Sequence, residues 1–479
     1  MGEKKKWNIA DSLAGNIKMG DKVVWIIVVL LIMLSLVSIF SSTSLMAIKE
    51  GISRTSILLK HLQIVGIGAL ILVTFSIIPS IKVYRQLSRW GFLFSLVLLL
   101  WLDLHIEVGQ FIRVRATNGA FRSIIIGGFS LQVFEVVKVA MVMYLSWAIQ
   151  AYETGKFSVA TALGTYWPKA FGWLKGARAQ RWVFIFLPII TVIVLILPGS
   201  TGSALLTGIV MFATILIGGV RWKDLIGVAV VATCGIALLV ALHIVSSGKV
   251  LDRMQTAFNR LKIELPYPDA KARETQKEKI SMARINPADL EKGTKEFNDY
   301  LDLIRQPDAA EIAIVQGGRR ILGKGPGKST QKYIVPVMFE DYMFSFIVEE
   351  YGLLVGFIVI LMYMSLFARG AIIVHNCSNR YAKTCVGGLV FLITFQALFH
   401  IMVNCNIGIV TGQTLPLISH GRCSFLCFCI AFGVILSISK IANEKIKKQQ
   451  MEEEKLMAMD DVSASLTMVE EIDEKLENQ

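Results

Sequence analysis

The stretch Val23–Phe40 reads VVWIIVVLLIMLSLVSIF, and it decides the fold class. It has no charged residue, and the apolar run continues to about Ala47. About 20 such residues are enough to cross a lipid bilayer as an α-helix. The run is too long for the apolar part of a cleaved signal peptide, which typically has about 7–15 residues. We therefore predict a retained transmembrane helix.

Similar apolar runs recur along the chain. Its 479 residues are 54% hydrophobic and 18% charged, whereas soluble domains are nearer to one quarter charged. The sequence predicts an all-α polytopic membrane protein of about ten transmembrane helices, with a transmembrane domain over 23–441. The predicted spans are roughly 23–45, 60–80, 90–106, 129–150, 183–198, 203–220, 224–246, 342–367, 384–404 and 422–440.

Basic residues indicate the orientation of the spans. The formal net charge is +13, and lysine and arginine gather in the short links between apolar runs. If the N-terminal segment 1–22 is cytoplasmic, these links all face the cytoplasm, as the positive-inside rule requires. Ten crossings then return the acidic tail 442–479 to the cytoplasm, where we expect its last part, 451–479, to be solvated and disordered or weakly helical. Because the basic charge reflects topology, we expect no nucleic-acid partner.

A long polar segment, 247–341, separates the seventh and eighth predicted spans. Long loops cross the membrane regardless of their charge, so we place it outside the cytoplasm. Asn286-Pro287 and Gln306-Pro307-Asp308 are helix-start signals, and the second helix should stop at Gly317-Gly318. Ordered loops of this length usually have a function.

The end of this loop, Gly317–Lys332, has five cationic residues and no acidic one. Gly323–Ser329 looks like a nucleotide-binding P-loop, but Leu322 stands where the first glycine is required, so the spacing excludes it. Glycine-rich backbone and the cations Lys324 and Lys328 could bind a pyrophosphate. The alternatives are a solvated loop or a contact with the anionic membrane surface.

Asp341 stands where this loop enters the next span. A carboxylate at that depth is unfavourable unless it is paired or functional. The alternative is a simple helix-start carboxylate favoured by the helix dipole. On a helix, Glu349 would lie about 80° from the Asp341 face and Glu350 opposite it. Glu349 could therefore line the same cavity, while Glu350 should brace a neighbouring helix.

Two further stretches have polar residues within apolar surroundings. Glu135 and Lys138 share one side of a predicted helix, where ionisable residues usually mark a polar cavity. The alternative is a structural ion pair. Thr411–Gly421 has glycine and proline at membrane-boundary depth, which is tolerated only inside protein or beside a wet cavity. His420 within it could titrate near neutrality, although an isolated histidine is more often a packing residue.

Together these stretches resemble the FtsW/RodA/SpoVE (SEDS) family. Asn118–Arg122 and Gly127–Lys138 match its patterns Asn-Gly-Ala-x-Arg and Gly-Gly-x-Ser-x-Gln-x-x-Glu-x-x-Lys. Gly317–Lys332 matches its glycine-rich loop, and Asp341–Gly352 matches an Asp-Phe-Ile-Phe motif followed by Glu-Glu-x-Gly. Thr411–Gly421 matches its Thr-Gly, Leu-Pro and Ile-Ser-x-Gly elements.

Four positions depart from the family pattern. Phe339-Glu340 replaces the usual His-Thr, and His400 stands near a usual Asn. Ser419–Ser424 reads SHGRCS instead of SYGGSS, and Leu197-Pro198-Gly199 replaces Gln-Pro-Asp. The aspartate itself is retained as Asp341.

The resemblance implies a peptidoglycan glycosyltransferase that transfers a lipid-pyrophosphate-linked glycan onto lipid II, an undecaprenyl-pyrophosphate disaccharide-peptide. Asp341 would be the catalytic base. No cofactor is certain; a divalent cation, Mg²⁺ or Mn²⁺, could assist, and no metal ligand is assigned. The implied substrate-binding residues are Arg122, Glu135, Lys138, Lys324, Lys328, Ser419 and His420.

The resemblance also implies a setting. It is the bacterial inner membrane, at the division septum if the extended cytoplasmic ends indicate an FtsW-type protein. The expected partners are a class B penicillin-binding transpeptidase and other division-complex membrane proteins. Two alternatives stay open. A lipid II transporter would suit Glu135 and Lys138, and a non-catalytic scaffold would suit the departures at His420 and Arg422.

Overall fold

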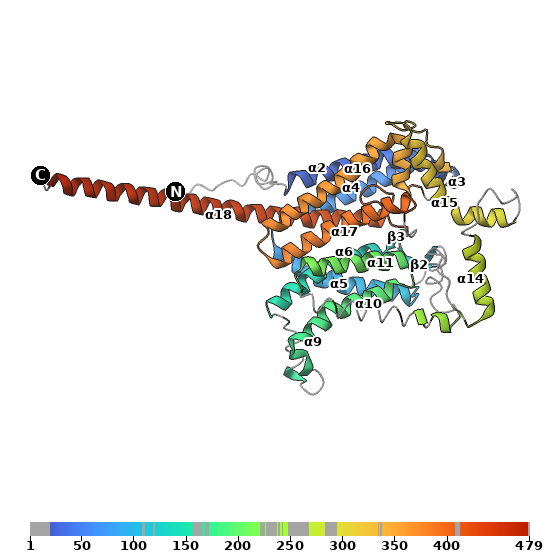
Figure 1. The fold of residues 1–479 in the computed structure, drawn as a ribbon, viewed down its shortest axis with the longest axis horizontal. Coiled ribbons are helices and arrows are strands. Elements are labelled where there is room, and N and C mark those ends of the chain that lie inside the picture. Colours follow the sequence, from blue (N-terminus) through green and yellow to red (C-terminus); the bar gives the residue numbers. More distant parts are fainter. Residues whose placement is uncertain are drawn as a thin grey trace.

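The computed structural model shows a bundle of long helices, from which the last helix, α18 (Arg422–Glu477), projects far beyond the others (Figure 1). The residues that it describes are 20–107, 111–117, 120–155, 157, 165–167, 172–220, 268–282, 295–333, 335, 338–407 and 412–477, with scattered positions between 226 and 247.

Most of the described chain is α-helical. The short elements are η1 (Gly172–Lys175), the π-helical η2 (Trp182–Phe186) and η4 (Gln331–Tyr333). The α-helices before α18 are α2 (Lys22–Ser42), α3 (Ser44–Glu50), α4 (Arg54–Ile77), α5 (Ile81–Asp103), α6 (Val133–Glu153), α9 (Ala177–Arg181), α10 (Leu187–Ile196), α11 (Thr201–Ile217), α14 (Ala270–Met282), α15 (Lys295–Gly318), α16 (Met343–Asn376) and α17 (Arg380–Asn404).

Within the described residues, seven helical segments are long and apolar enough to cross a membrane. They confirm the predicted polytopic helical class, and α5 and α11 lie at two further predicted spans. The predicted span 224–246 lies mostly outside the described residues. The seven are α2, α4, α6, the continuous α9–η2–α10 segment, α16, α17 and the first part of α18.

The helices differ in how they are solvated. On α2, Ile26 and Met33 are each 59% exposed, as expected for a face in contact with lipid. By contrast, α6 is buried along most of its length and packs against α5, α11, α17 and α18. Figure 1 shows α6 and α11 between α17 and α5. Charged residues on α6 therefore lie inside protein and not in lipid.

The structure corrects the prediction that a span begins at residue 129. A three-stranded antiparallel sheet precedes α6, with strands β1 (Ile112–Thr117), β2 (Ala120–Ile126) and β3 (Phe129–Gln132) in that order. The β2–β3 turn is Gly127-Gly128, with φ of 55° and 87°. A two-residue hairpin turn with positive φ at both positions favours glycine. Strand β3 leads directly into α6, so Glu135 lies in the first turn of that helix.

Two predictions about the polar segments are corrected in part. Helix α15 ends at Gly318 as expected, but it begins at Lys295 and contains Pro307 instead of starting there. The Asn286-Pro287 signal lies outside the described residues. The tail, predicted to be disordered or weakly helical, continues α18 as helix to Glu477. Its glutamate, leucine, methionine and alanine content favours a helix.

Candidate active site

Asp341 lies two residues before α16 begins. Helix α16 packs against α15, which Figure 1 shows at the same end of the bundle as the sheet. Its side chain is partly buried. Burial raises the pKa of Asp341 to about 6, and the positive charge of Arg122 opposes that rise. The carboxylate is therefore mostly ionised at neutral pH and able to accept a proton.

The backbone on either side of this carboxylate is anchored residue by residue. The carbonyls of 339–341 each accept a hydrogen bond from a different side chain or amide. The donors are, in that order, the backbone N–H of His420 (2.9 Å), the Ser419 hydroxyl (2.7 Å) and the Asn404 side-chain amide (3.1 Å). Ser419 and His420 thus use these polar groups to hold the Asp341 segment, and their predicted contact with substrate stays a prediction.

The carboxylate itself is less constrained than its backbone. Within the described part of the chain, it accepts no hydrogen bond. Gly412 lies against it with φ of 60°, and a Cβ there would come within 3.2 Å of Asp341 Oδ2. The positive φ favours glycine in this loop, and any larger residue would also have to shift the carboxylate slightly.

A second carboxylate adjoins the first. Burial, with the negative charge of Asp341, raises the pKa of Glu340 to about 7, while Arg422 and Arg115 lower it. From the sequence, Glu340 was named only as a departure from the family pattern, and Arg115 was not selected. Arg122 donates from Nε to the Gly199 carbonyl at 3.2 Å. Two carboxylates and several guanidinium groups thus share this end of the bundle.

His420 differs from the expectation that it titrates near neutrality. Burial, assisted by the charge of Arg422, lowers the pKa of His420 to about 4. Its ring lies 5.3 Å from that of His61 and packs edge-on against Phe339 at 5.7 Å. The imidazole is therefore neutral at physiological pH, as the packing interpretation predicts.

Lys138 and Glu135 form a buried ion pair, with 2.7 Å between Nζ and Oε1. The ammonium also donates to the side-chain carbonyls of Gln396 (2.6 Å) and Gln413 (3.1 Å). An ammonium has three donors, and all three are used here. Ser424 donates to the other Glu135 oxygen at 3.2 Å. These contacts support a structural role, and binding of substrate by either residue stays a prediction.

Lys324 is engaged by the protein. Its ammonium is 2.5 Å from Glu349 Oε1 and also contacts Gln316 and Thr330. Ser329 donates to Glu349 Oε2 at 2.5 Å. Glu349 therefore faces the glycine-rich loop. The sequence had instead indicated that Glu349 could line the same cavity as Asp341. Lys324 is not presented to a pyrophosphate in this arrangement.

Glu350 braces a neighbouring helix, which confirms the prediction. Its Oε2 accepts from Ser41 of α2 at 2.9 Å and lies 3.8 Å from the Lys332 ammonium. The next turn contains Gly352, whose φ of 89° interrupts the helix. A Cβ at Gly352 would lie 2.1 Å from the Ile321 carbonyl, so only glycine fits. Lys328, by contrast, is exposed and stays accessible to an anion.

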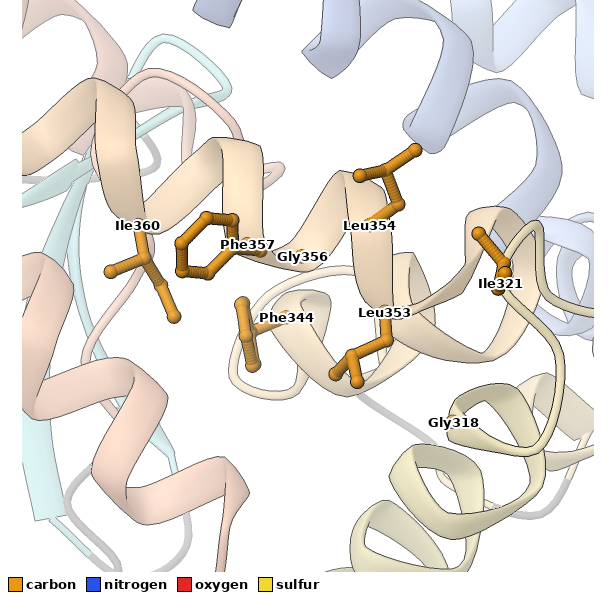
Figure 2. A pocket seen from close by; sticks show the side chains of 8 residues that line it. All are labelled: Gly318, Ile321, Phe344, Leu353, Leu354, Gly356, Phe357 and Ile360. Carbon is orange, nitrogen blue, oxygen red and sulfur yellow. The ribbon is translucent and has the colours of Figure 1, made fainter.

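An apolar pocket of about 420 Å³ lies beside this kink. Figure 2 shows Ile321 of the loop and Phe344, Leu353 and Phe357 of α16 along it. Its lining has almost no polar surface. The pocket suits hydrocarbon and could not hold the polar groups of a reaction.

The described residues include no group of three or more His, Cys, Asp or Glu side chains that could hold a metal ion. Glu340 and Asp341 supply two carboxylates only. The described residues therefore do not by themselves form a metal centre, and the predicted use of Mg²⁺ or Mn²⁺ stays a prediction.

Apolar spanning helices with a carboxylate and arginines at one end define a polytopic membrane protein with a candidate polar site at one end of its bundle. The chain belongs to the FtsW/RodA/SpoVE family of cell cycle proteins, whose model matches residues 21–262 and 295–444. The resemblance stated from the motifs is thereby confirmed.

Curated relatives agree with this membership, and solved structures share the fold. The probable peptidoglycan glycosyltransferase FtsW of Coxiella burnetii is 26% identical over 80% of this chain and 86% of its own length. The probable peptidoglycan glycosyltransferase FtsW of Bacillus subtilis is 23% identical over 88% of this chain and 92% of its own length. A match to one chain of a solved peptidoglycan synthase complex covers 88% of this chain and 98% of that chain. Its TM-score is 0.58 at 18% identity. The rod shape determining protein RodA of Thermus thermophilus matches over 88% and 98%, with a TM-score of 0.53 at 19% identity.

Proposed function

We propose that this chain is a peptidoglycan glycosyltransferase that extends glycan strands during septal cell-wall synthesis. One observation carries the proposal: Asp341, mostly ionised at neutral pH, lies at one end of a membrane bundle with its backbone anchored, and its carboxylate accepts no hydrogen bond from the described residues. The names of the curated relatives support the same reaction class.

The reaction needs a proton acceptor and a stabilised leaving group. Asp341 takes the proton of the acceptor sugar hydroxyl. At the same time the oxygen of that hydroxyl bonds to the anomeric carbon of the donor glycan. The bond from that carbon to the lipid pyrophosphate breaks, and the pyrophosphate departs as an anion. Arg122, with Arg115 and Arg422 near Glu340, supplies positive charge for that anion. Direct transfer with a single base is expected to invert the anomeric configuration.

Lipid II is the substrate that fits such chemistry, because its pyrophosphate would lie at the polar end while its polyprenyl chain stays in the bilayer. A class B penicillin-binding transpeptidase is the proposed partner, supported by the matched peptidoglycan synthase complex, in which polymerization and crosslinking are coordinated. Both termini are proposed to be cytoplasmic and the protein to act at the septum. No step is assigned to a metal ion.

The proposal is tested by incubating the purified chain, alone and with its transpeptidase, with fluorescent lipid II. We expect glycan polymer that a muramidase digests. Transfer of lipid II across vesicle membranes without polymer would instead indicate a transporter. Neither polymer nor transfer, with a control polymerase active, would indicate a scaffold.

A further inference from the structure

Helix α16 begins without a cap from its own chain segment. Its N-cap residue, Tyr342, makes no side-chain capping hydrogen bond. The first N–H groups of a helix have no acceptor within the helix. A serine, threonine, aspartate or asparagine at the N-cap usually accepts one of them. Since Met343, Phe344 and Ser345 are all buried, these N–H groups need acceptors from elsewhere.

Helix α17 supplies two of these acceptors. The Phe344 N–H donates to His400 Nε2 at 3.3 Å, and the Ser345 N–H donates to Asn404 Oδ1 at 2.9 Å. His400 and Asn404 are four residues apart and so lie on one side of α17. They are 1% and 0% exposed. One helix therefore caps another through two buried side chains.

The surrounding hydrogen bonds permit one arrangement of protons. His400 Nδ1 lies 2.6 Å from the Gln413 carbonyl, which can only accept. Nδ1 must therefore carry the proton, and Nε2 is left as the acceptor. The Asn404 amide nitrogen donates to the carbonyls of His400 (2.8 Å) and Asp341 (3.1 Å). Its oxygen must consequently face Ser345.

We propose that His400 and Asn404 are positioning residues for the Asp341 carboxylate. The inference rests on the proposed function, in which Asp341 is the base. Asn404 holds the Asp341 carbonyl, and the cap fixes the start of α16 two residues later. Being buried, both act through the backbone and not on the substrate. A displacement of about 1 Å can slow an enzymatic reaction about 10²-fold.

The kinetic test compares Asn404→Leu and His400→Leu with a matched control, Thr394→Val. Thr394 is a buried residue of α17 whose hydroxyl bonds only to carbonyls of its own helix, at 2.8 and 3.3 Å. We expect kcat to fall about 10²-fold in both leucine variants, with KM within about threefold of wild type. Thr394→Val should resemble wild type. His400→Gln, which keeps an acceptor, should recover most of the kcat lost in His400→Leu.

A second readout detects the cap without any chemistry. Hydrogen–deuterium exchange of peptides covering 339–348 should quicken in Asn404→Leu and His400→Leu and stay unchanged in Thr394→Val. Unchanged exchange in the leucine variants would refute the cap. Faster exchange with a wild-type kcat would refute positioning, as would equal losses in His400→Leu and His400→Gln.

The two readouts also separate this inference from the proposed function. If wild type makes polymer and Asp341→Asn does not, the function stands and the capping variants decide the inference. If wild type makes no polymer with its partner present, the function fails and the positioning claim fails with it, while exchange still decides whether the cap exists. Should Asn404→Leu not fold, the pair His400→Leu and His400→Gln carries the test.

Discussion

Charged residues of this site differ in whether the protein has already engaged them. Lys138 and Lys324 each donate to several side chains within the bundle or loop. Asp341 has an anchored backbone, and its carboxylate accepts no hydrogen bond from the described residues, although the charge of Arg122 acts on it. Availability for chemistry therefore favours Asp341 over the buried cations, although all three come from equally conspicuous motifs.

The pH dependence of polymerisation follows from Asp341. A base must be unprotonated, so the rate should fall as the pH drops through about 6, the pKa of this carboxyl. Arg122 favours the ionised form, so Arg122→Gln should raise the pKa and move the acid limb to higher pH. Arg113→Gln, on the same sheet, serves as the control. A limb that stays in place or moves to lower pH in Arg122→Gln contradicts this account.

At the residue scale, the sequence predicted positions better than contacts. The place of Asp341 could be predicted because a carboxylate at the start of an apolar run is conspicuous. The direction of Glu349 could not, because it depends on how the distant Ser329 and Thr330 fold back to meet it. The neutral state of His420 depends on burial by several elements, which one chain segment does not reveal.

At the scale of elements, the glycine-rich loop and α16 form one unit. The loop amides of Lys324 and Gly325 donate to the carbonyls of Glu349 and Glu350, at 2.9 Å each. The Glu349 carboxylate accepts a hydrogen bond from the Ser329 hydroxyl, and the Glu350 carboxylate accepts one from a loop amide. The non-helical backbone of Gly352 interrupts α16 where the loop packs against it. The loop motif and the Glu-Glu-x-Gly motif are therefore two halves of one structure.

Removing the Glu349 carboxylate should destabilise this unit. Glu349→Ala leaves the Ser329 hydroxyl without its acceptor and the Lys324 ammonium without its charged partner. Losing one partner of a buried pair typically removes about 3 kcal/mol of stability. We expect a clear fall in melting temperature in detergent. Glu311→Ala, at an exposed position, should change the unfolding free energy by less than about 0.5 kcal/mol. Equal effects of the two variants would refute the role of Glu349.

The sheet shows what sequence reasoning missed among the elements. Ile112–Thr117 reads IRVRAT, an alternation of apolar and basic residues typical of a strand. The Gly127-Gly128 pair is a hairpin signal of the same kind. The first stretch was not interpreted, and the glycine pair was assigned only to a family motif that precedes a helix. The start of α6 was consequently predicted too early.

At the scale of the whole molecule, long apolar runs and basic links were enough to predict a polytopic helical bundle. The arrangement of the helices was not predictable, because it depends on packing between spans that are uniformly apolar. The interior position of α6 explains how Glu135 and Lys138 are tolerated. Their partners Gln396, Gln413 and Ser424 come from distant parts of the chain, which no local pattern reveals.

A chelator should not loosen this architecture. The described residues offer no cluster of metal ligands, so EDTA is expected to leave the melting temperature unchanged. A fall that added Mg²⁺ or Mn²⁺ reverses would reveal a resident metal that stabilises the fold. Polymerisation followed in the same samples tests separately whether a divalent ion assists the reaction.

The most direct test of the central claim is lipid II polymerisation by the Asp341→Asn protein in complex with its transpeptidase. Glu311→Gln is the matched control, since Glu311 is an exposed carboxylate of α15 that accepts a hydrogen bond from Asn406 at 3.2 Å. We predict that Asp341→Asn inserts and melts as wild type does but polymerises at least about 10²-fold more slowly, while Glu311→Gln keeps the wild-type rate. Polymerisation by Asp341→Asn at the wild-type rate would remove Asp341 from the mechanism.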